Sequence, residues 1–436
     1  MTARALQLAL LLLVVGNLGR IPIADSAGKQ APFLVNDFVV LAILVIASVE
    51  AMRRRAFRLD WPGGLGVLFA IVGAVAAVLA VPRFGLSGFE LAFSLAYLFR
   101  WLAYFGLYIA AVNLLSREDV PGLLGAFDAA VLLFAVFGIF QAVFLPGFAQ
   151  LVYPESVLYV DWDPQGHRLV STFLDPNYAG ALLTIALLLY AGRLSVGERV
   201  PLWRVAVLLM ALVLTLSRGS MLAFGFGLVV VLLIRGVSAR TLKLAGVFAL
   251  LAAPAVPRLI TFAASFNKLG VDASALTRLV AWSRALRVFA DSPIFGVGFN
   301  TYGYVGRFYG FEDSGRPVFG LDGGLLFIAV MTGVVGLTLF VAVMGLVVMR
   351  ARRVWRDTTA SAQERGVAVG VAAMTAAMVV HSLFVNSLLL PFLMEPLWLL
   401  WAVPFVVRRP GLQSRRREAR GDAPPHVGVV SFPRAA

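Results

Sequence analysis

The sequence has no cysteine, and only three histidines and three lysines occur among its 436 residues. The absence of cysteine excludes disulfides, thiolate metal sites and cysteine nucleophiles. Charged residues are also scarce, at 14% of the chain, whereas soluble domains contain about 25%. Hydrophobic residues make up 60% of the chain. This balance excludes a soluble globular protein, a coiled coil and a disordered chain, and it indicates a protein that lies in a lipid bilayer.

Long apolar runs recur along the whole chain. A membrane-spanning helix needs roughly 20 mostly apolar residues, and the alternating pattern of a membrane β-barrel is missing. We therefore predict an all-α, polytopic membrane protein with about twelve transmembrane helices. The predicted spans cover residues 5–19, 33–51, 63–82, 89–115, 121–145, 178–192, 201–217, 219–235, 242–262, 321–349, 366–386 and 388–407. The first span also fits a signal peptide, but no clear cleavage site follows it, which favours a retained helix.

The net charge of +14 orients these helices. If the N-terminus is cytoplasmic, most of the 37 basic residues fall in cytoplasmic segments, as the positive-inside rule requires, and both termini are cytoplasmic. The basic excess then sets the topology and faces the anionic lipids of the inner leaflet. No nucleic-acid partner is needed to explain it.

The chain is expected to form a single membrane domain over residues 1–409. Two extracytoplasmic segments, residues 146–177 and 263–320, are longer than ordinary connecting loops and rich in aromatic residues. We expect ordered structure in them, including an amphipathic helix from about Ser274 to Ala290. The last residues, 410–436, are rich in Arg, Gly and Pro, and predict a disordered cytoplasmic tail.

Arginines on the outer side are the first candidates for a binding site. Arg218 lies in a minimal turn between two apolar runs, where it is either an interfacial anchor or a functional cation. Arg168 precedes Asp175-Pro176-Asn177, which has the composition of a turn that leads into a helix, with Asn177 as a plausible cap. A structural role is favoured for this tripeptide.

The predicted outer helix carries three further arginines. At 100° per residue, Arg284 and Arg287 share a face, while Arg278 lies about 120° from Arg284. All three therefore cannot converge on one ligand, although two can. Trp282, one turn after Arg278, suits a helix that rests on the lipid interface. Arginine in several outer elements indicates bidentate recognition of phosphate, although arginine is also the default cation of this chain.

Candidate general bases lie on the same side. Asp322 precedes an apolar run, where it is either a helix cap or a catalytic carboxylate. Glu312 and Asp313 lie in the outer loop, and His381 ends the eleventh predicted span, where a packing role is the alternative to catalysis.

Three further ionisable residues lie within predicted spans. Arg100 and Asp128 either form an intramembrane pair or are unrelated, and Glu395 lies in the last span. No cluster with metal-ligand spacing is present, so no metal or other cofactor is predicted.

Taken together, these residues resemble the O-antigen ligase and O-antigen polymerase superfamily of bacterial polysaccharide-assembly enzymes, mainly over residues 165–340. The similarity is carried by Arg168 with Thr172-Phe173 and Pro176-Asn177, by Ser217-Arg218-Gly219, by Arg278 with Trp282, by Asp291-Ser292-Pro293-Ile294-Phe295-Gly296-Val297-Gly298 and by Gly333-Val334-Val335-Gly336-Leu337.

The resemblance implies metal-independent, inverting glycosyl transfer at the outer face of the bacterial inner membrane. It implies a donor glycan on undecaprenyl diphosphate, with Arg218 and Arg278 holding the diphosphate and Arg168 and Arg284 as further binding candidates. The acceptor is a lipid-linked repeat unit or lipid A core. Ligases of this family carry a histidine where this chain has Asp322. That departure favours a polymerase, with Asp322 or His381 as the base. The alternatives are a ligase and, in another class, a lipid-linked oligosaccharide transporter.

Overall fold

The computed structural model describes residues 1–26, 29–153, 168–236, 246, 248, 273–311 and 321–407. The first half contains α1 (Thr2–Leu12), η1 (Leu13–Gly19), β1 (Arg20–Ser26), β2 (Lys29–Leu34), α2 (Val35–Arg54), α3 (Trp61–Phe84), α4 (Gly88–Leu114), η2 (Arg117–Asp119), α5 (Val120–Phe144) and α6 (Phe148–Val152). The second half contains η3 (Ser171–Phe173), α8 (Pro176–Ser195), α9 (Leu202–Leu214), α10 (Arg218–Arg235), α13 (Ala273–Asp291), α14 (Tyr302–Val305), α15 (Gly324–Trp355), α16 (Ala362–His381), η5 (Ser387–Leu389) and α17 (Pro391–Val407).

The predicted all-α membrane fold is confirmed. Eight helical segments of the described chain are long and apolar enough to cross a bilayer, namely Thr2–Gly19, Val35–Arg54, Trp61–Phe84, Gly88–Leu114, Arg117–Phe144, Pro176–Ser195, Arg218–Arg235 and Gly324–Trp355. The apolar helices α9 and α17 are shorter. Eleven of the twelve predicted spans thus coincide with these helices or with α16.

Several sequence predictions fall outside the described residues. The ninth span, 242–262, is described only at residues 246 and 248, and the tail at 410–436 is not described. Within the outer segments, residues 154–167, 263–272 and 312–320 are also outside. The predicted amphipathic helix is present as α13, which begins at Ala273 and ends at Asp291.

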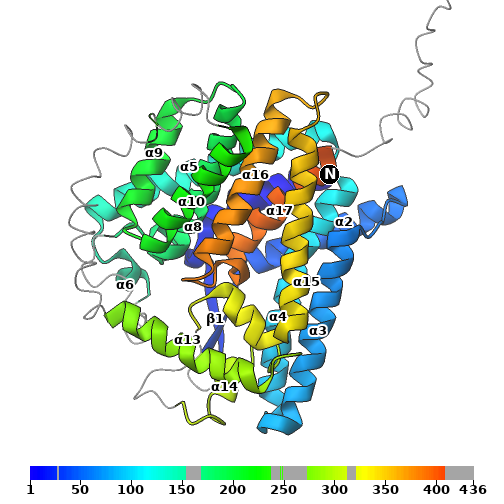
Figure 1. Ribbon diagram of the computed structural model, residues 1–436, viewed down its shortest axis with the longest axis vertical. Coiled ribbons are helices and arrows are strands. Elements are labelled where there is room, and N and C mark those ends of the chain that lie inside the picture. Colours follow the sequence, from blue (N-terminus) through cyan, green and yellow to red (C-terminus); the bar gives the residue numbers. More distant parts are fainter. Residues whose placement is uncertain are drawn as a thin grey trace, which may run out of the picture.

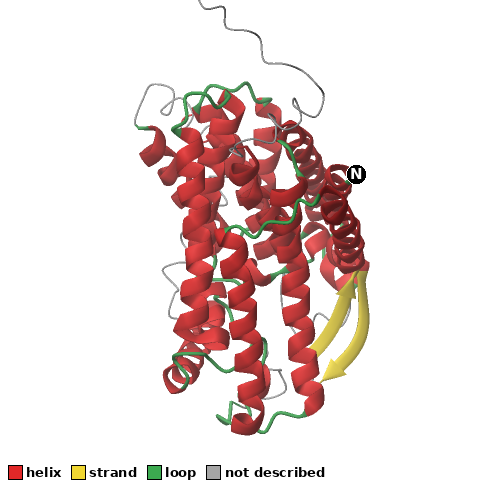
Figure 2. Cartoon of the chain, turned by 90° about the vertical axis from the view of Figure 1, so that its right-hand side faces the viewer, coloured by secondary structure: helices red, strands yellow, loops and turns green. Residues whose placement is uncertain are grey.

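The sequence did not predict the antiparallel hairpin of β1 and β2. It pairs Arg20 with Leu34 and Ser26 with Lys29 between the first two spans. Figure 2 shows the hairpin along one side of the helical bundle. A guanidinium nitrogen of Arg100 in α4 donates to the carbonyl of Pro32 at 2.5 Å, which anchors β2 to the bundle.

The apolar core includes a cluster of large aromatic side chains between α4 and α17. Trp101 stacks on Phe105 with ring centroids 5.3 Å apart, and Trp398 meets Phe105 edge to face at 5.0 Å. Trp101 and Trp398 are each 2% exposed. Aromatic pairs in these arrangements contribute more than their buried area alone.

The helices α8 and α16 pack closely in the centre of the bundle. Gly366 and Gly370 form a Gly-x-x-x-Gly motif in α16, and a Cβ atom at Gly192 of α8 would lie 2.4 Å from the Gly366 carbonyl oxygen. Small residues at such a crossing let two membrane helices approach along their backbones. Since Arg193 near the end of α8 meets Gly366 near the start of α16, the helices are antiparallel, and α8 begins where α16 ends (Figure 1).

At a kink in α15, the Gly333–Leu337 motif contacts the Asp291–Gly298 motif that follows α13. Gly333 has φ of 65° and ψ of −171°, which interrupts the helix. The amide of Val334 donates to the carbonyl of Pro293 at 2.7 Å, and the amide of Val297 donates to the carbonyl of Val330 at 2.9 Å. The segment after α13 thus satisfies backbone groups that the kink releases, as required where water is excluded. A Cβ atom at Gly333 would lie 2.0 Å from the Ile294 carbonyl oxygen, so only glycine fits there.

The buried charges have partners other than those considered from the sequence. Arg100 pairs with Asp37 at 2.7 Å, and Asp128 pairs with Arg193 at 3.2 Å. The possible Arg100–Asp128 pair is therefore wrong, because each residue meets its partner through helix packing. Glu395 is fully buried and accepts a hydrogen bond from the Asn36 amide at 3.0 Å.

Candidate functional site

The predicted site residues gather where α8 and α10 begin and α16 ends, which we call the site end of the bundle. Asn177, the second residue of α8, accepts a hydrogen bond from the Ser217 hydroxyl at 2.9 Å. Ser220 of α10 lies 3.0 Å from Nε2 of His381, the last residue of α16. These contacts hold the ends of three helices together. In Figure 1, α13 lies across the bundle next to these ends.

Asp322 lies in the connection to α15 and faces α13. Its carboxylate accepts a hydrogen bond from Nε of Arg278 at 3.3 Å, and its carbonyl accepts one from the Trp282 indole at 2.7 Å. The helix begins only at Gly324, with Gly323 as its cap residue, so the interpretation of Asp322 as a helix cap is wrong. A Cβ atom at Gly323 would lie 3.6 Å from the Leu383 carbonyl oxygen, which places this connection beside the end of α16.

The charges of Asp322 and Arg278 remain accessible. The side chain of Asp322 is 50% exposed and that of Arg278 is 24% exposed. The surrounding helix ends exclude enough water to raise the pKa of the Asp322 carboxyl above its usual value, and the Arg278 guanidinium opposes this rise. The pair thus combines a basic carboxylate with a cation that helps to keep it ionised.

Asp175 links Arg168 to the same region. It caps α8 by accepting from the amides of Asn177 and Tyr178, at 2.7 and 3.1 Å. The predicted turn into a helix is therefore present, but the cap is Asp175 rather than Asn177. Burial raises the pKa of Asp175, the two amides and the charge of Arg168 lower it, and the charge of Asp322 raises it further. The charges of both Arg168 and Asp322 thus act on the Asp175 carboxyl.

Arg168 and Arg218 lie at the two sides of the turn between α9 and α10. Nε of Arg168 donates to the carbonyl of Thr215 at 2.9 Å. Arg218 is the first residue of α10, directly after its cap residue Ser217, and is half-buried. The structure thus brings Arg168, Arg218 and Arg278 to elements that meet at the site end.

Arg284 has a different environment from Arg278, although both lie on α13. Its guanidinium lies 5.4 Å from the centre of the Phe311 ring, and that of Arg287 lies 5.8 Å from the Tyr309 ring. These aromatic contacts place Arg284 against the segment after α14, whereas Arg278 faces Asp322.

His381 is completely buried, and both of its ring nitrogens have hydroxyl partners. Nε2 contacts Ser220 and Nδ1 contacts Ser387 in η5. Asp322 therefore has better access to a substrate than His381.

Sequence reasoning missed the two serines, Asn177 as their partner, and Asp175 as a cap. The signals for them were local: Ser217 and Ser220 flank Arg218, and Asp175 starts the Asp-Pro-Asn turn. Glu312 and Asp313 lie outside the described residues. Within the described part of the chain, no group of three or more His, Asp or Glu side chains is arranged to hold a metal ion.

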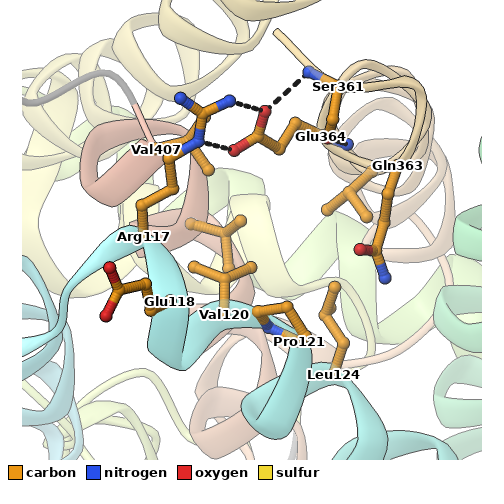
Figure 3. A pocket seen from close by; sticks show the side chains of 11 residues that line it. Arg117, Glu118, Val120, Pro121, Leu124, Ser361, Gln363, Glu364 and Val407 are labelled. Atoms are coloured by element: carbon orange, nitrogen blue, oxygen red, sulfur yellow. Dashed lines mark hydrogen bonds and ion pairs between the residues drawn. The ribbon is translucent and has the colours of Figure 1, made fainter.

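A cavity of about 250 Å³ lies at the opposite end of α16, near Ser361 (Figure 3). An ion pair between Arg117 and Glu364 lies at one side of it, and apolar residues such as Val120 and Leu124 line the rest. Since the 20 residues of α16 separate it from His381, by about 30 Å at 1.5 Å per residue, this cavity is not part of the site end.

Comparison with known proteins gives one family. No curated protein matches the chain. Residues 203–341 match the family described as O-antigen ligase, and this range includes Arg218, Arg278 and Asp322. The matched segment thus covers α10, α13 and the connection that carries Asp322, which are elements of the site end. Over this segment, the chain is similar to the O-antigen ligase family, which supports the resemblance to the O-antigen ligase and polymerase superfamily.

Proposed function

We propose that this membrane protein polymerises polysaccharide repeat units, using a glycan on undecaprenyl diphosphate as the donor. The family match supports transfer of the ligase or polymerase type in general. The observation that carries the finer proposal is the accessible Arg278–Asp322 pair at the helix ends where Arg168 and Arg218 also lie. In this proposal, Asp322 is the base and the three arginines are the cations of one site.

The proposed reaction is a single displacement. The acceptor hydroxyl oxygen attacks the anomeric carbon of the donor glycan, a new glycosidic bond forms, and the bond between that carbon and the diphosphate oxygen breaks. Asp322 takes the proton of the hydroxyl, and undecaprenyl diphosphate leaves with the bonding electrons. Attack opposite the leaving group inverts the anomeric configuration, and no metal is required in this scheme.

The arginines stabilise the leaving diphosphate. A guanidinium has five N–H donors, so Arg278 contacts Asp322 through Nε and keeps further donors for phosphate oxygens. Arg218 and Arg168 add positive charge from the turn between α9 and α10, and Arg284 is a further candidate from α13. Preorganised cations at a developing negative charge are a major source of rate. In this scheme Asp322 is the base that the substrate reaches, since His381 is buried.

In this proposal the site end lies on the outer face of the bacterial inner membrane and both termini lie in the cytoplasm, which the distribution of basic residues along the chain supports. The acceptor is then the next lipid-linked repeat unit. A second candidate is a ligase that transfers the glycan to lipid A core, because the matched family is described as O-antigen ligase. Transport of the lipid-linked glycan is less favoured, since the buried Arg100 and Asp128 are paired within the protein.

Purified protein in vesicles, supplied with labelled lipid-linked repeat units alone, tests the proposal. A ladder of longer products, made in the presence of a metal chelator and lost in Asp322→Asn, is the expected result. Product formation only after addition of lipid A core would replace polymerase with ligase. Movement of the label across the bilayer without any new glycosidic bond would establish transport instead.

A further inference from the structure

A buried cluster of Asn177, Ser217, Ser220, His381 and Ser387 connects α8, α10, α16 and η5 at the site end. Ser217, Ser220, His381 and Ser387 are at most 1% exposed. We call these five residues the histidine–serine cluster. None of the four buried members can touch a substrate directly, so the cluster needs another explanation.

The hydroxyl groups of Ser217 and Ser220 contact more acceptors than they have protons. Each hydroxyl has a single proton to donate. The Ser217 hydroxyl donates to the side-chain oxygen of Asn177 at 2.9 Å, and the Ser220 hydroxyl donates to the Asn177 carbonyl at 3.2 Å. The hydroxyl oxygens of Ser217 and Ser220 also lie 2.8 Å apart, and the Ser220 oxygen lies 3.0 Å from Nε2 of His381. With the Ser220 proton directed to Asn177 or to Ser217, we assign Nε2 of His381 as the donor to the Ser220 oxygen.

The second ring nitrogen of His381 is then the acceptor of the Ser387 hydroxyl. A neutral imidazole has one donor and one acceptor nitrogen, so both are occupied. The ring keeps no lone pair for the proton of an acceptor sugar. This arrangement fits a residue that positions its neighbours rather than a general base.

The element held by the cluster is the turn that carries Arg218. Ser217 caps α10 by accepting from the amide of Ser220, at 3.4 Å. Leu216, just before the cap, has φ of 51°, a backbone conformation that costs free energy for a residue other than glycine. Such a turn persists only where its surroundings hold it.

Contacts from other elements hold the same turn. Arg168 donates to the carbonyl of Thr215 from the α9 side, and a Cβ atom at Gly219 would lie 3.3 Å from Cβ of Phe384, which follows α16. Arg218 lies between Thr215 and Gly219, so its backbone is fixed from both sides.

We propose that His381 is a positioning residue that acts through Ser220 and Ser217 to fix the Arg218 turn for binding a lipid diphosphate. The inference rests on the proposed function, because it assigns Arg218 to the diphosphate. Without the ring, Ser220 and Ser387 each lose their histidine partner, the cap of α10 is no longer tied to α16, and Arg218 loses its fixed place. Misplacement of a binding group by about 1 Å can cost up to about a hundredfold.

Binding of undecaprenyl diphosphate to the full-length protein in detergent tests this role. We expect His381→Ala to weaken binding by between about tenfold and a hundredfold. His381→Gln keeps one donor and one acceptor in the side chain, and it should recover much of the loss. Arg218→Ala should weaken binding to a similar extent as His381→Ala, with a melting temperature near that of the wild type.

The double variant Arg218→Ala/His381→Ala decides whether His381 acts through Arg218. If it does, the double variant binds no more weakly than Arg218→Ala alone. Additive losses would overturn the inference, as would wild-type binding by His381→Ala. If His381→Ala fails to fold, Ser387→Ala replaces it in the same cycle with Arg218→Ala.

The pH profile of polymer formation separates positioning from catalysis. A positioning role predicts that His381→Gln keeps the acidic limb of the wild-type profile, while loss of that limb would make His381 a base and overturn the inference. The failure of the two proposals can be told apart. If Arg218→Ala binds undecaprenyl diphosphate as tightly as the wild type, Arg218 does not hold the diphosphate. If Arg218→Ala weakens binding but His381→Ala does not, only the positioning role of His381 is removed.

Discussion

Arginines at the two ends of the bundle are engaged in different ways. At the opposite end, Arg193 donates to Glu198 at 2.7 Å and to Asp128 at 3.2 Å, and its side chain is only 15% exposed. Arg117 binds both carboxylate oxygens of Glu364. The guanidinium groups of these two arginines are committed to carboxylates of the protein.

At the site end, Arg278 makes a hydrogen bond of 3.3 Å to the half-exposed carboxylate of Asp322, its one carboxylate contact within the described part of the chain. A single long bond at an accessible position is easier to exchange for a ligand than a bidentate bond. Residue type alone therefore does not identify a binding arginine in this chain; the number and geometry of its carboxylate contacts do.

The largest effect on stability is expected at Arg193. Arg193→Ala removes the ion-pair partner of Asp128, and removal of one partner from a largely buried ion pair costs about 3–5 kcal/mol. The free energy of unfolding in detergent should fall by that amount. The double variant Arg193→Met/Asp128→Asn, which removes both charges, should recover part of it. A wild-type unfolding curve for Arg193→Ala would mean that Arg193 and Asp128 do not form an ion pair in the protein.

The largest effect on activity without loss of stability is expected at Arg278. Arg278→Ala should slow polymer formation by about 10²- to 10³-fold, equivalent to about 3–4 kcal/mol, because a cation at the leaving diphosphate is lost. The melting temperature should change little, since the side chain makes one accessible contact. Arg287→Ala on the same helix is the matched control and should keep nearly full activity. Equal losses in both variants would remove the distinction between the two arginines.

The pH dependence of the reaction tests the pair itself. Asp322 must be ionised to accept a proton, so activity should fall as the pH drops through its pKa. Since burial raises this pKa, the acidic limb should lie above that of an ordinary aspartate, and since Arg278 lowers it, Arg278→Ala should move the limb to higher pH. Rates of ladder formation across pH measure this shift. A limb that moves to lower pH in Arg278→Ala would contradict the pairing.

The fold was largely predictable because membrane helices are long apolar segments. The kink at Gly333 was not, since it depends on hydrogen bonds to Pro293 and from Val297, about 40 residues earlier in the chain. The β1–β2 hairpin was also missed, because its prolines and its short length give little strand signal. In both cases the backbone bonds that decide the structure join segments that local patterns do not connect.

The site was predictable as separate residues but not as pairs. Arg278 and Asp322 were each recognised, yet 44 residues separate them, and only the packing of α13 against the start of α15 makes them partners. For the same reason the sequence left open whether Arg100 and Asp128 pair, and the structure shows that they do not, because neighbouring helices supply their partners.

The smallest effect is expected at Arg117, although it contacts both carboxylate oxygens of Glu364. Its side chain is 45% exposed, and exposed ion pairs contribute about 0–1 kcal/mol. Glu364 also keeps its place at the start of α16 without Arg117, because its carboxylate accepts from the amide of Ser361 at 2.8 Å. Arg117→Ala should therefore leave polymer formation within about twofold of wild type and shift the melting temperature slightly. A large loss of activity with an intact fold would show that the cavity beside Arg117 is coupled to the site end. An arginine bound to a carboxylate of the protein could then be functional, and the contrast between the two ends of the bundle would not hold.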